Sequence, residues 1–232
     1  MVVHGFQKTT LLDYPGHLAS TVFLGRCNFC CPFCHNSALV LAPDDVETME
    51  GEEVLGLIKK RAGMLEGVCI TGGEPTLTPE LPDFIKRIKD MGLLVKLDSN
   101  GYKPAVLDSL LSAGIVDYVA MDIKASKENY ANVCGVEKID IGRIEESVNI
   151  IAEKAPDYEF RTTYVKGLHT EDDVRGIGEW LAGDHTYFIQ NYKEGPTVIS
   201  PVYEGFSEEE IHRFKDILLA TMPNTHIRGD YE

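Results

Sequence analysis

The stretch CNFCCPFCHN, residues 27–36, places four cysteines within eight positions of the chain. Two spacings compete for them. Read as paired CxxC motifs, Cys27/Cys30 and Cys31/Cys34 would form a zinc knuckle or redox dithiols. Read as CxxxCxxC, the set Cys27, Cys31 and Cys34 would bind an iron–sulfur cluster and leave Cys30 aside. The rest of the chain has to decide between these interpretations.

The adjacency of Cys30 and Cys31 favours the second spacing. A tetrahedral zinc site usually takes its two CxxC halves from separated hairpins, and halves joined by adjacent cysteines cannot fold back around one ion. Three thiolates at CxxxCxxC can instead hold one corner of a cubane each, which leaves one iron without a protein ligand. An open metal position is where a substrate or cofactor coordinates. Phe33 would shield the cluster from water.

The composition indicates a globular protein without a nucleic-acid or membrane partner. The 232 residues predict one domain, 1–232, and carry a net charge of −15 from 22 basic and 37 acidic residues. Such an acidic surface argues against phosphate-backbone binding. No apolar run has the length of a membrane span, and we see no secretory signal, so we expect a cytoplasmic protein. Cys69 and Cys134 are then expected to be small buried side chains.

Strand-like and helical patterns alternate along the chain about six times, which predicts parallel strands with right-handed crossovers. This is fewer than the eight units of a closed barrel. We therefore expect an α/β fold, a partial (β/α)6 TIM-like barrel of parallel strands, with a doubly wound sheet as the alternative. Residues 39–51 form the longest expected loop before a helix. The predicted strands are 20–25, 67–71, 93–99, 117–123, 158–165, 186–191 and 225–229.

Polar and glycine-rich segments follow the predicted strands, at the edge where parallel α/β proteins gather their functional groups. The cysteine motif follows the first strand and GGEPT (72–76) the second, while LDSNG (97–101) ends the third and MDIK (121–124) the fourth. Arg161 lies within the fifth strand. Taken alone, GGEP and LDSNG are most simply turns. Their shared position is the stronger signal.

The combination of CNFCCPFCHN with GGEP resembles the radical S-adenosylmethionine superfamily. The run 5–36, together with DSNG and MDIKA, resembles the activating enzymes of glycyl radical enzymes. Within these the chain is most similar to the activating proteins of anaerobic ribonucleoside-triphosphate reductase, which are similar to pyruvate formate-lyase activating enzyme. The likeness covers nearly the whole chain. This sequence departs from the family at Cys30, where a residue other than cysteine is usual. It also lacks the cysteine-rich ferredoxin insert that some activating enzymes carry.

The resemblance implies a role for each matching residue. Cys27, Cys31 and Cys34 would bind a 4Fe–4S cluster whose open iron chelates S-adenosylmethionine. Asp122 and Lys124 would be catalytic residues near the methionyl carboxylate and the substrate peptide. Asp98 and Asp122 could also share a monovalent cation. The cofactor-binding residues would be Gly72, Gly73, Glu74, Asp98, Ser99, Asn100, Lys124 and Arg161.

The implied reaction is reductive cleavage of S-adenosylmethionine to a 5′-deoxyadenosyl radical, which would install a glycyl radical on a partner enzyme. That partner would be a glycyl radical enzyme such as anaerobic ribonucleotide reductase, and the electron donor a flavodoxin- or ferredoxin-type protein. Three alternatives stay open. One is a radical enzyme acting on a small molecule, nucleoside or peptide. The others are a non-enzymatic zinc-binding interaction module and a nucleotide-binding protein, although GGEP lacks the Lys-Ser/Thr of a P-loop.

Overall fold

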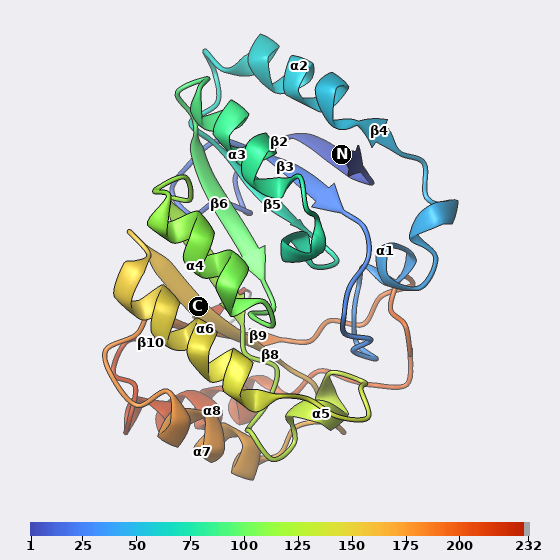
Figure 1. Cartoon of the computed structure of the whole chain (residues 1–232). Coiled ribbons are helices and arrows are strands. Elements are labelled where there is room, and N and C mark those ends of the chain that lie inside the picture. The colour runs from blue at the N-terminus through green and yellow to red at the C-terminus, as the bar shows by residue number, and fades with distance from the viewer. Residues whose placement is uncertain (230–232) are drawn as a thin grey trace. The chain divides into compact units, whose positions relative to one another are not determined.

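The computed structural model describes residues 1–229 of the chain, which divide into two compact units (Figure 1). Unit 1 comprises residues 1–28, 38–120 and 142–158. Unit 2 comprises residues 29–37 and 121–141 together with the chain from residue 159 onward. The expectation of a single domain over 1–232 stays a prediction.

Unit 1 is built on a mostly parallel sheet. Its strands are β2 (Gly5–Thr10), β3 (Ala19–Leu24), β5 (Gly67–Gly72), β6 (Leu94–Ser99) and β7 (Tyr118–Asp122), in the order β7-β6-β5-β3-β2. β3 pairs with β5 and β5 with β6 in parallel, whereas β2 runs antiparallel to β3. The last two residues of β7 belong to unit 2.

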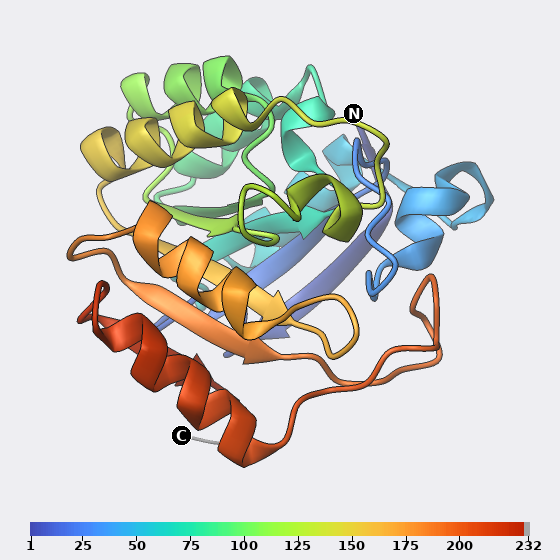
Figure 2. The same cartoon turned by 90° about the horizontal axis from the view of Figure 1, so that it is seen from below.

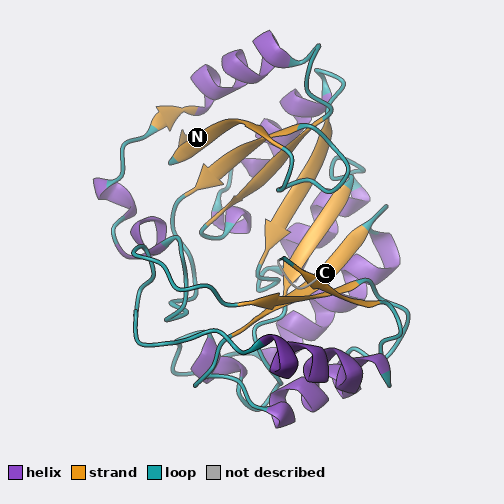
Figure 3. Cartoon of the chain, turned by 180° about the vertical axis from the view of Figure 1, so that it is seen from behind, coloured by secondary structure: helices purple, strands orange, loops and turns teal. Residues whose placement is uncertain are grey.

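The helices of unit 1 alternate with its strands along the chain, and Figure 3 distinguishes helices from strands by colour. They are α2 (Gly51–Arg61), α3 (Leu81–Lys89), α4 (Pro104–Ser112) and α6 (Ile141–Lys154). Each buries one apolar side, and α2, α3 and α6 expose charges on the other, which is the expected amphipathic pattern. α3 and α4 end shortly before Gly92 and Gly114, whose φ angles of +79° and +65° suit glycine after a helix.

Unit 2 contains β8 (Tyr158–Tyr164), β9 (Tyr187–Asn191) and β10 (Thr225–Arg228), in the order β10-β9-β8-β7. β8 pairs with β9 and β9 with β10 in parallel. The helices are α5 (Tyr130–Val133), α7 (Glu171–Trp180) and α8 (Glu208–Leu219), and α7 and α8 pack against each other (Figure 2). Capping boxes of Thr170 with Asp173 and Ser207 with Glu210 begin α7 and α8.

All seven predicted strands are present, but residues 39–51 are not the simple loop that we expected. This segment contains the end of α1 (Ser37–Leu41), a 3-10 turn at Pro43–Asp45 and β4 (Met49–Glu50). β4 forms because it pairs with β1 (Val2–Val3), a partner more than forty positions away. β2 also went unpredicted, since Gln7, Lys8 and Thr9 are exposed and show no apolar alternation. Among residues 1–229, no helix is both long enough and apolar enough to cross a membrane.

Candidate active site

The chain enters the cysteine motif in unit 1 through a residue with unusual backbone geometry. Arg26 has a φ of +71°. Among residues 1–229, no other residue except glycines has a positive φ. The N–H of Arg26 donates to Leu39 O at 2.7 Å, and its carbonyl accepts from Glu74 N at 2.8 Å. The left-handed conformation is held in place by these two bonds, which fix the backbone immediately before Cys27.

The two glycines of GGEP allow β5 to end directly against this segment. A Cβ on Gly72 would lie 2.2 Å from Leu24 O, and one on Gly73 would lie 2.1 Å from Arg26 O. Both contacts involve backbone, so no side chain can be accommodated without moving the chain. In unit 1 the structure therefore brings GGEP together with the start of the cysteine motif, as the sequence indicated.

Glu74 is fully buried, with 0% of its surface exposed. Its carboxylate accepts hydrogen bonds from Thr76 N at 3.1 Å, Thr76 Oγ1 at 2.5 Å, Ser99 Oγ at 2.9 Å and Asn100 N at 2.6 Å. Burial raises the pKa of this carboxyl, while the hydrogen bonds act in the opposite direction. The side chain joins the ends of β5 and β6, and its contact with a cofactor amine stays a prediction.

Asn100 links the end of β6 to the first cysteine. Its side-chain amide donates to Asn28 Oδ1 at 3.0 Å and approaches Cys27 Sγ at 3.8 Å. The Nδ2 atom of Asn28 is buried and has no hydrogen-bond partner among the described residues. A buried donor beside a cysteine ligand is what a cluster or its bound cofactor would satisfy.

Asp98 is paired within unit 1. Its carboxylate forms an ion pair with Lys96, whose side chain is only 2% exposed, and Cys69 Sγ lies 3.8 Å from the same carboxylate. Lys96 was not among the sequence candidates because a lysine within a strand usually reaches solvent. Here it is buried and lies 5.8 Å from the ring centre of Tyr118. The charge of Asp98 is thus already balanced by a protein cation.

Unit 2 holds the other two predicted ligands, Cys31 and Cys34. A hydrogen bond with the Cys134 side chain lowers the pKa of the Cys31 thiol, with help from the charge of Lys124 and against the effect of burial. Burial raises the pKa of Cys34. Cys134, expected to be merely buried, therefore contacts a predicted ligand, and its carbonyl also accepts from Cys30 N at 2.9 Å.

Asp122, Lys124 and Arg161 form one charged cluster in unit 2. Lys124 Nζ lies 2.9 Å from Asp122 Oδ2, and Arg161 Nε lies 2.6 Å from Asp122 Oδ1. Burial acts to raise the pKa of Asp122, but the positive charges of Arg161 and Lys124 hold it well below its usual range. Burial acts to lower the pKa of Lys124, and the charges of Asp122 and Cys31 raise it instead. Asp122 is a carboxylate and Lys124 an ammonium group at neutral pH.

Two further observations in unit 2 concern the cysteine loop. Phe33 is buried, as expected for a shielding residue, and the Lys124 ammonium lies 6.0 Å from its ring centre. His35 shares a hydrogen bond with Lys193 O at 2.7 Å. His169, which the sequence did not single out, is buried and shares a hydrogen bond with Lys124 O at 2.7 Å. The sequence signal that could have pointed to His169 is its position shortly after the end of β8.

The cysteines present offer the thiolate ligands of an iron–sulfur cluster, in which each thiolate binds a different iron. Among residues 1–229, no group of three or more His, Cys, Asp or Glu side chains is arranged to hold one ion. Cys27, Cys31 and Cys34 are free of disulfides, and a thiol with a lowered pKa at Cys31 suits a thiolate ligand.

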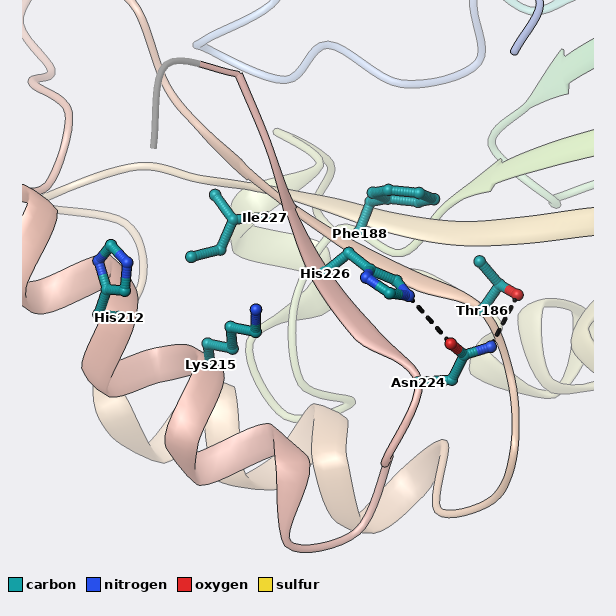
Figure 4. A pocket seen from close by; sticks show the side chains of 7 residues that line it. All are labelled: Thr186, Phe188, His212, Lys215, Asn224, His226 and Ile227. Carbon is teal, nitrogen blue, oxygen red and sulfur yellow. Dashed lines mark hydrogen bonds between the residues drawn. The ribbon is translucent and has the colours of Figure 1, made fainter. Parts of the chain in front are cut away.

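A separate hollow of about 590 Å³ opens on unit 2 between α8 and the strands β9 and β10 (Figure 4). His212 and Lys215 reach it from α8, and His226 from β10. The ring of His226 bonds to Asn224 Oδ1 at 2.9 Å. None of the predicted site residues lines this hollow, so it is not the candidate active site.

Comparison with known proteins identifies the family. A family model described as "Radical SAM superfamily" matches residues 21–181. The Methanocaldococcus jannaschii protein named "Putative glycyl-radical enzyme activating enzyme MJ1227" is 30% identical over 196 residues, 83% of this chain and 80% of the relative. The Metallosphaera sedula "Probable GTP 3',8-cyclase" is 32% identical over 131 residues, 53% of this chain and 40% of that protein.

A solved structure agrees on the fold. Streptococcus suis SuiB bound to S-adenosylmethionine superposes with a TM-score of 0.69 at 12% identity, over 90% of this chain and 52% of that one. The expected α/β fold of the partial TIM-like barrel type is confirmed. Proteins of this family use a 4Fe–4S cluster and S-adenosylmethionine, so these two expected cofactors are confirmed as well. The chain belongs to the radical S-adenosylmethionine superfamily.

Proposed function

We propose that this protein is an activating enzyme that installs a glycyl radical on a partner enzyme. The observation that carries the proposal is the share of each chain that the alignment with a relative covers. The relative named as a glycyl-radical enzyme activating enzyme aligns over 83% of this chain and 80% of its own length. The cyclase relative aligns over only 53% and 40%, a share that the cofactor-binding part common to the superfamily could account for.

Cys27, Cys31 and Cys34 are proposed as the cluster ligands, and the backbone at Gly72 and Gly73 as the surface nearest the methionyl group. When bound, the cluster and S-adenosylmethionine supply one-electron chemistry that removes a hydrogen atom from a substrate C–H bond. Buried Phe33 excludes water from the side of the cysteine loop. This exclusion matters because a competing hydrogen donor would quench the reaction.

The charged cluster of Asp122, Lys124 and Arg161 is proposed to orient the methionyl carboxylate and the substrate peptide. Asp122 holds both cations close together, so a negatively charged group that approaches meets two positive side chains in fixed positions. The ion pairs also bear on the predicted monovalent cation. Asp98 is paired with Lys96, and Asp122 with Lys124 and Arg161, so neither carboxylate needs a metal ion for charge balance.

The test uses electron paramagnetic resonance on the reconstituted protein, reduced without oxygen in the presence of S-adenosylmethionine and an anaerobic ribonucleoside-triphosphate reductase. A flavodoxin- or ferredoxin-type protein serves as the electron donor. We expect a glycyl doublet on the reductase. A cluster signal that responds to S-adenosylmethionine, without a doublet on this or any other glycyl radical enzyme, would contradict the proposal.

A second candidate is a radical enzyme that acts on a small molecule, and it rests on the partial likeness to the cyclase. It predicts 5′-deoxyadenosine formation that depends on an added nucleoside and needs no protein substrate. Liquid chromatography of reaction mixtures with and without each nucleoside triphosphate distinguishes the two functions.

A further inference from the structure

The backbone that carries Asp122 and Lys124 is held by side chains that lie beyond it in the sequence. Thr162 Oγ1, on β8, donates to Ile123 O at 2.7 Å. His169, in the connection from β8 to α7, shares a hydrogen bond with Lys124 O at 2.7 Å. Ser126 Oγ donates to Asp173 Oδ1 at 2.8 Å at the start of α7. Three successive points of this segment are therefore tied to the same neighbouring region of unit 2.

The direction of the His169 hydrogen bond follows from the other contact that its ring makes. Val165 N donates to His169 Nδ1 at 3.0 Å, so Nδ1 is the acceptor nitrogen. The other nitrogen, Nε2, faces a carbonyl, which can only accept, and must carry the proton. Only the neutral ring protonated at Nε2 satisfies both backbone groups at once.

The surroundings of His169 favour this neutral form. The side chain is 4% exposed, and the Tyr164 ring packs edge-on with centroids 5.3 Å apart. Burial has the largest effect and lowers the pKa of the imidazole, as does the charge of Lys124, while Asp173 and the Lys124 carbonyl act to raise it. The lowering effects are larger, so the ring is neutral at physiological pH.

Lys124 depends on this contact because His169 bonds to its own carbonyl. Moving that carbonyl would move the Cα of Lys124 and change the reach of its ammonium group toward Asp122, now at 2.9 Å. Arg161 occupies the other oxygen of the same carboxylate at 2.6 Å. The cluster is thus set from one side by β8, through Arg161, and from the other by His169.

We propose that His169 is a positioning residue for the cofactor site, which holds Lys124 in place through its Nε2–H donor. The inference rests on the proposed role of Lys124. His169 does not need to contact the cofactor itself. It acts only through the position of the Lys124 backbone.

Two variants separate this role from general support of the loop. In His169→Gln, the side-chain amide nitrogen can occupy the place of Nε2 and still donate to Lys124 O, but the acceptor for Val165 N is lost. In His169→Asn, the amide oxygen can occupy the place of Nδ1 and accept from Val165 N, but the donor to Lys124 O is lost. His226→Gln is the matched control, since His226 is exposed on β10 and its ring shares a hydrogen bond with Asn224 Oδ1, away from the proposed site.

Each variant is reconstituted without oxygen and measured for iron content and for its dissociation constant for S-adenosylmethionine, from the change in the reduced cluster signal. We expect His169→Asn to bind about fivefold to tenfold more weakly, the effect of one hydrogen bond. His169→Gln and His226→Gln should stay near the wild-type value, with iron content unchanged in all three. Nitrogen-15 resonance of the ring should show the Nε2–H tautomer in the wild type.

The inference is overturned if His169→Asn binds as well as wild type while Lys124→Met binds weakly, because Lys124 then matters without the tie. It is equally overturned if His169→Gln binds as weakly as His169→Asn, or if the ring carries its proton at Nδ1. If Lys124→Met itself binds normally, the proposed role of Lys124 fails first and the positioning role fails with it.

Discussion

The buried carboxylate of Glu74 accepts the backbone N–H of Asn100 at 2.6 Å, which joins the end of β5 to the end of β6. Asn100 in turn reaches Asn28 and Cys27 through its side-chain amide. A single acidic group therefore connects the glycine motif, the following strand and the first cysteine of unit 1.

Replacing Glu74 with glutamine should disturb this connection. All of its recorded partners are donors, so an amide nitrogen in place of one oxygen sets donor against donor in a buried place. We expect a loss of about 1–3 kcal/mol in the free energy of unfolding, measured by chemical denaturation. Glu80→Gln is the control, because Glu80 is exposed and caps nothing with its side chain. Equal effects of the two variants would contradict the structural role of Glu74.

Cys27→Ala, Cys31→Ala and Cys34→Ala should each abolish cluster binding, whereas Cys30→Ala should preserve it. Cys30 contributes a backbone N–H to Cys134 O at 2.9 Å, and alanine keeps that bond. Iron and sulfide content after anaerobic reconstitution measures the outcome. Loss of the cluster in Cys30→Ala, with retention in one of the other three, would show that Cys30 is a ligand in place of one of them.

Asp122→Asn should weaken activation of the partner more than it lowers cluster content. The substitution removes the negative charge between two cations and so weakens the ion pairs that Lys124 and Arg161 make with Asp122. Because the group is only partly buried, we expect a cost of about 2 kcal/mol, below the 3–5 kcal/mol of a fully buried pair. Iron content and glycyl radical yield are compared in one preparation. A parallel decline of both would remove the assigned role.

Gly135→Ala should disturb the cysteine loop. Gly135 has a φ of +65°, and a Cβ there would lie 2.1 Å from Cys30 O. Gly114→Ala is a matched control, since Gly114 has the same φ but nothing within 4 Å of the added atom. Both should lose about 1–2 kcal/mol to the left-handed backbone, and Gly135→Ala should lose more and take up less iron. Equal losses in stability and iron would mean that the close contact is unimportant.

The stability of the apoprotein should fall as the pH is lowered through the titration of His169. Its pKa in the folded state lies below the unfolded value of about 6.5, so below that pH the unfolded chain binds a proton that the native ring does not. The contribution is complete above about pH 6.5 and is lost progressively toward the native pKa. Denaturation curves at about pH 7.5 and about pH 5.5 measure it. In His169→Gln the difference between the two curves should shrink, and an unchanged difference would contradict the assignment.

Periodicity and spacing in the sequence were sufficient for the repeating elements and for the cofactor motif. The seven strands from β3 to β10 that carry apolar runs were predictable because their own residues encode burial on the sheet. The spacing of Cys27, Cys31 and Cys34 indicated the cluster, because adjacent cysteines exclude the paired zinc arrangement. Strand β2 and the pairing of β1 with β4 were not predictable, since short polar strands form only where a partner offers its edge.

The tertiary structure alone decided how the polar groups pair. Lys96 is buried against Asp98, Cys134 bonds to Cys31, and His169 reaches Lys124 across 45 positions of sequence. No local pattern specifies such contacts, because each depends on two distant segments packing at a defined separation. The sequence by itself determined the seven strands with apolar runs and the cofactor motif. Packing within each unit determined which side chains are ionised, which are neutral and which of them hold the others in place.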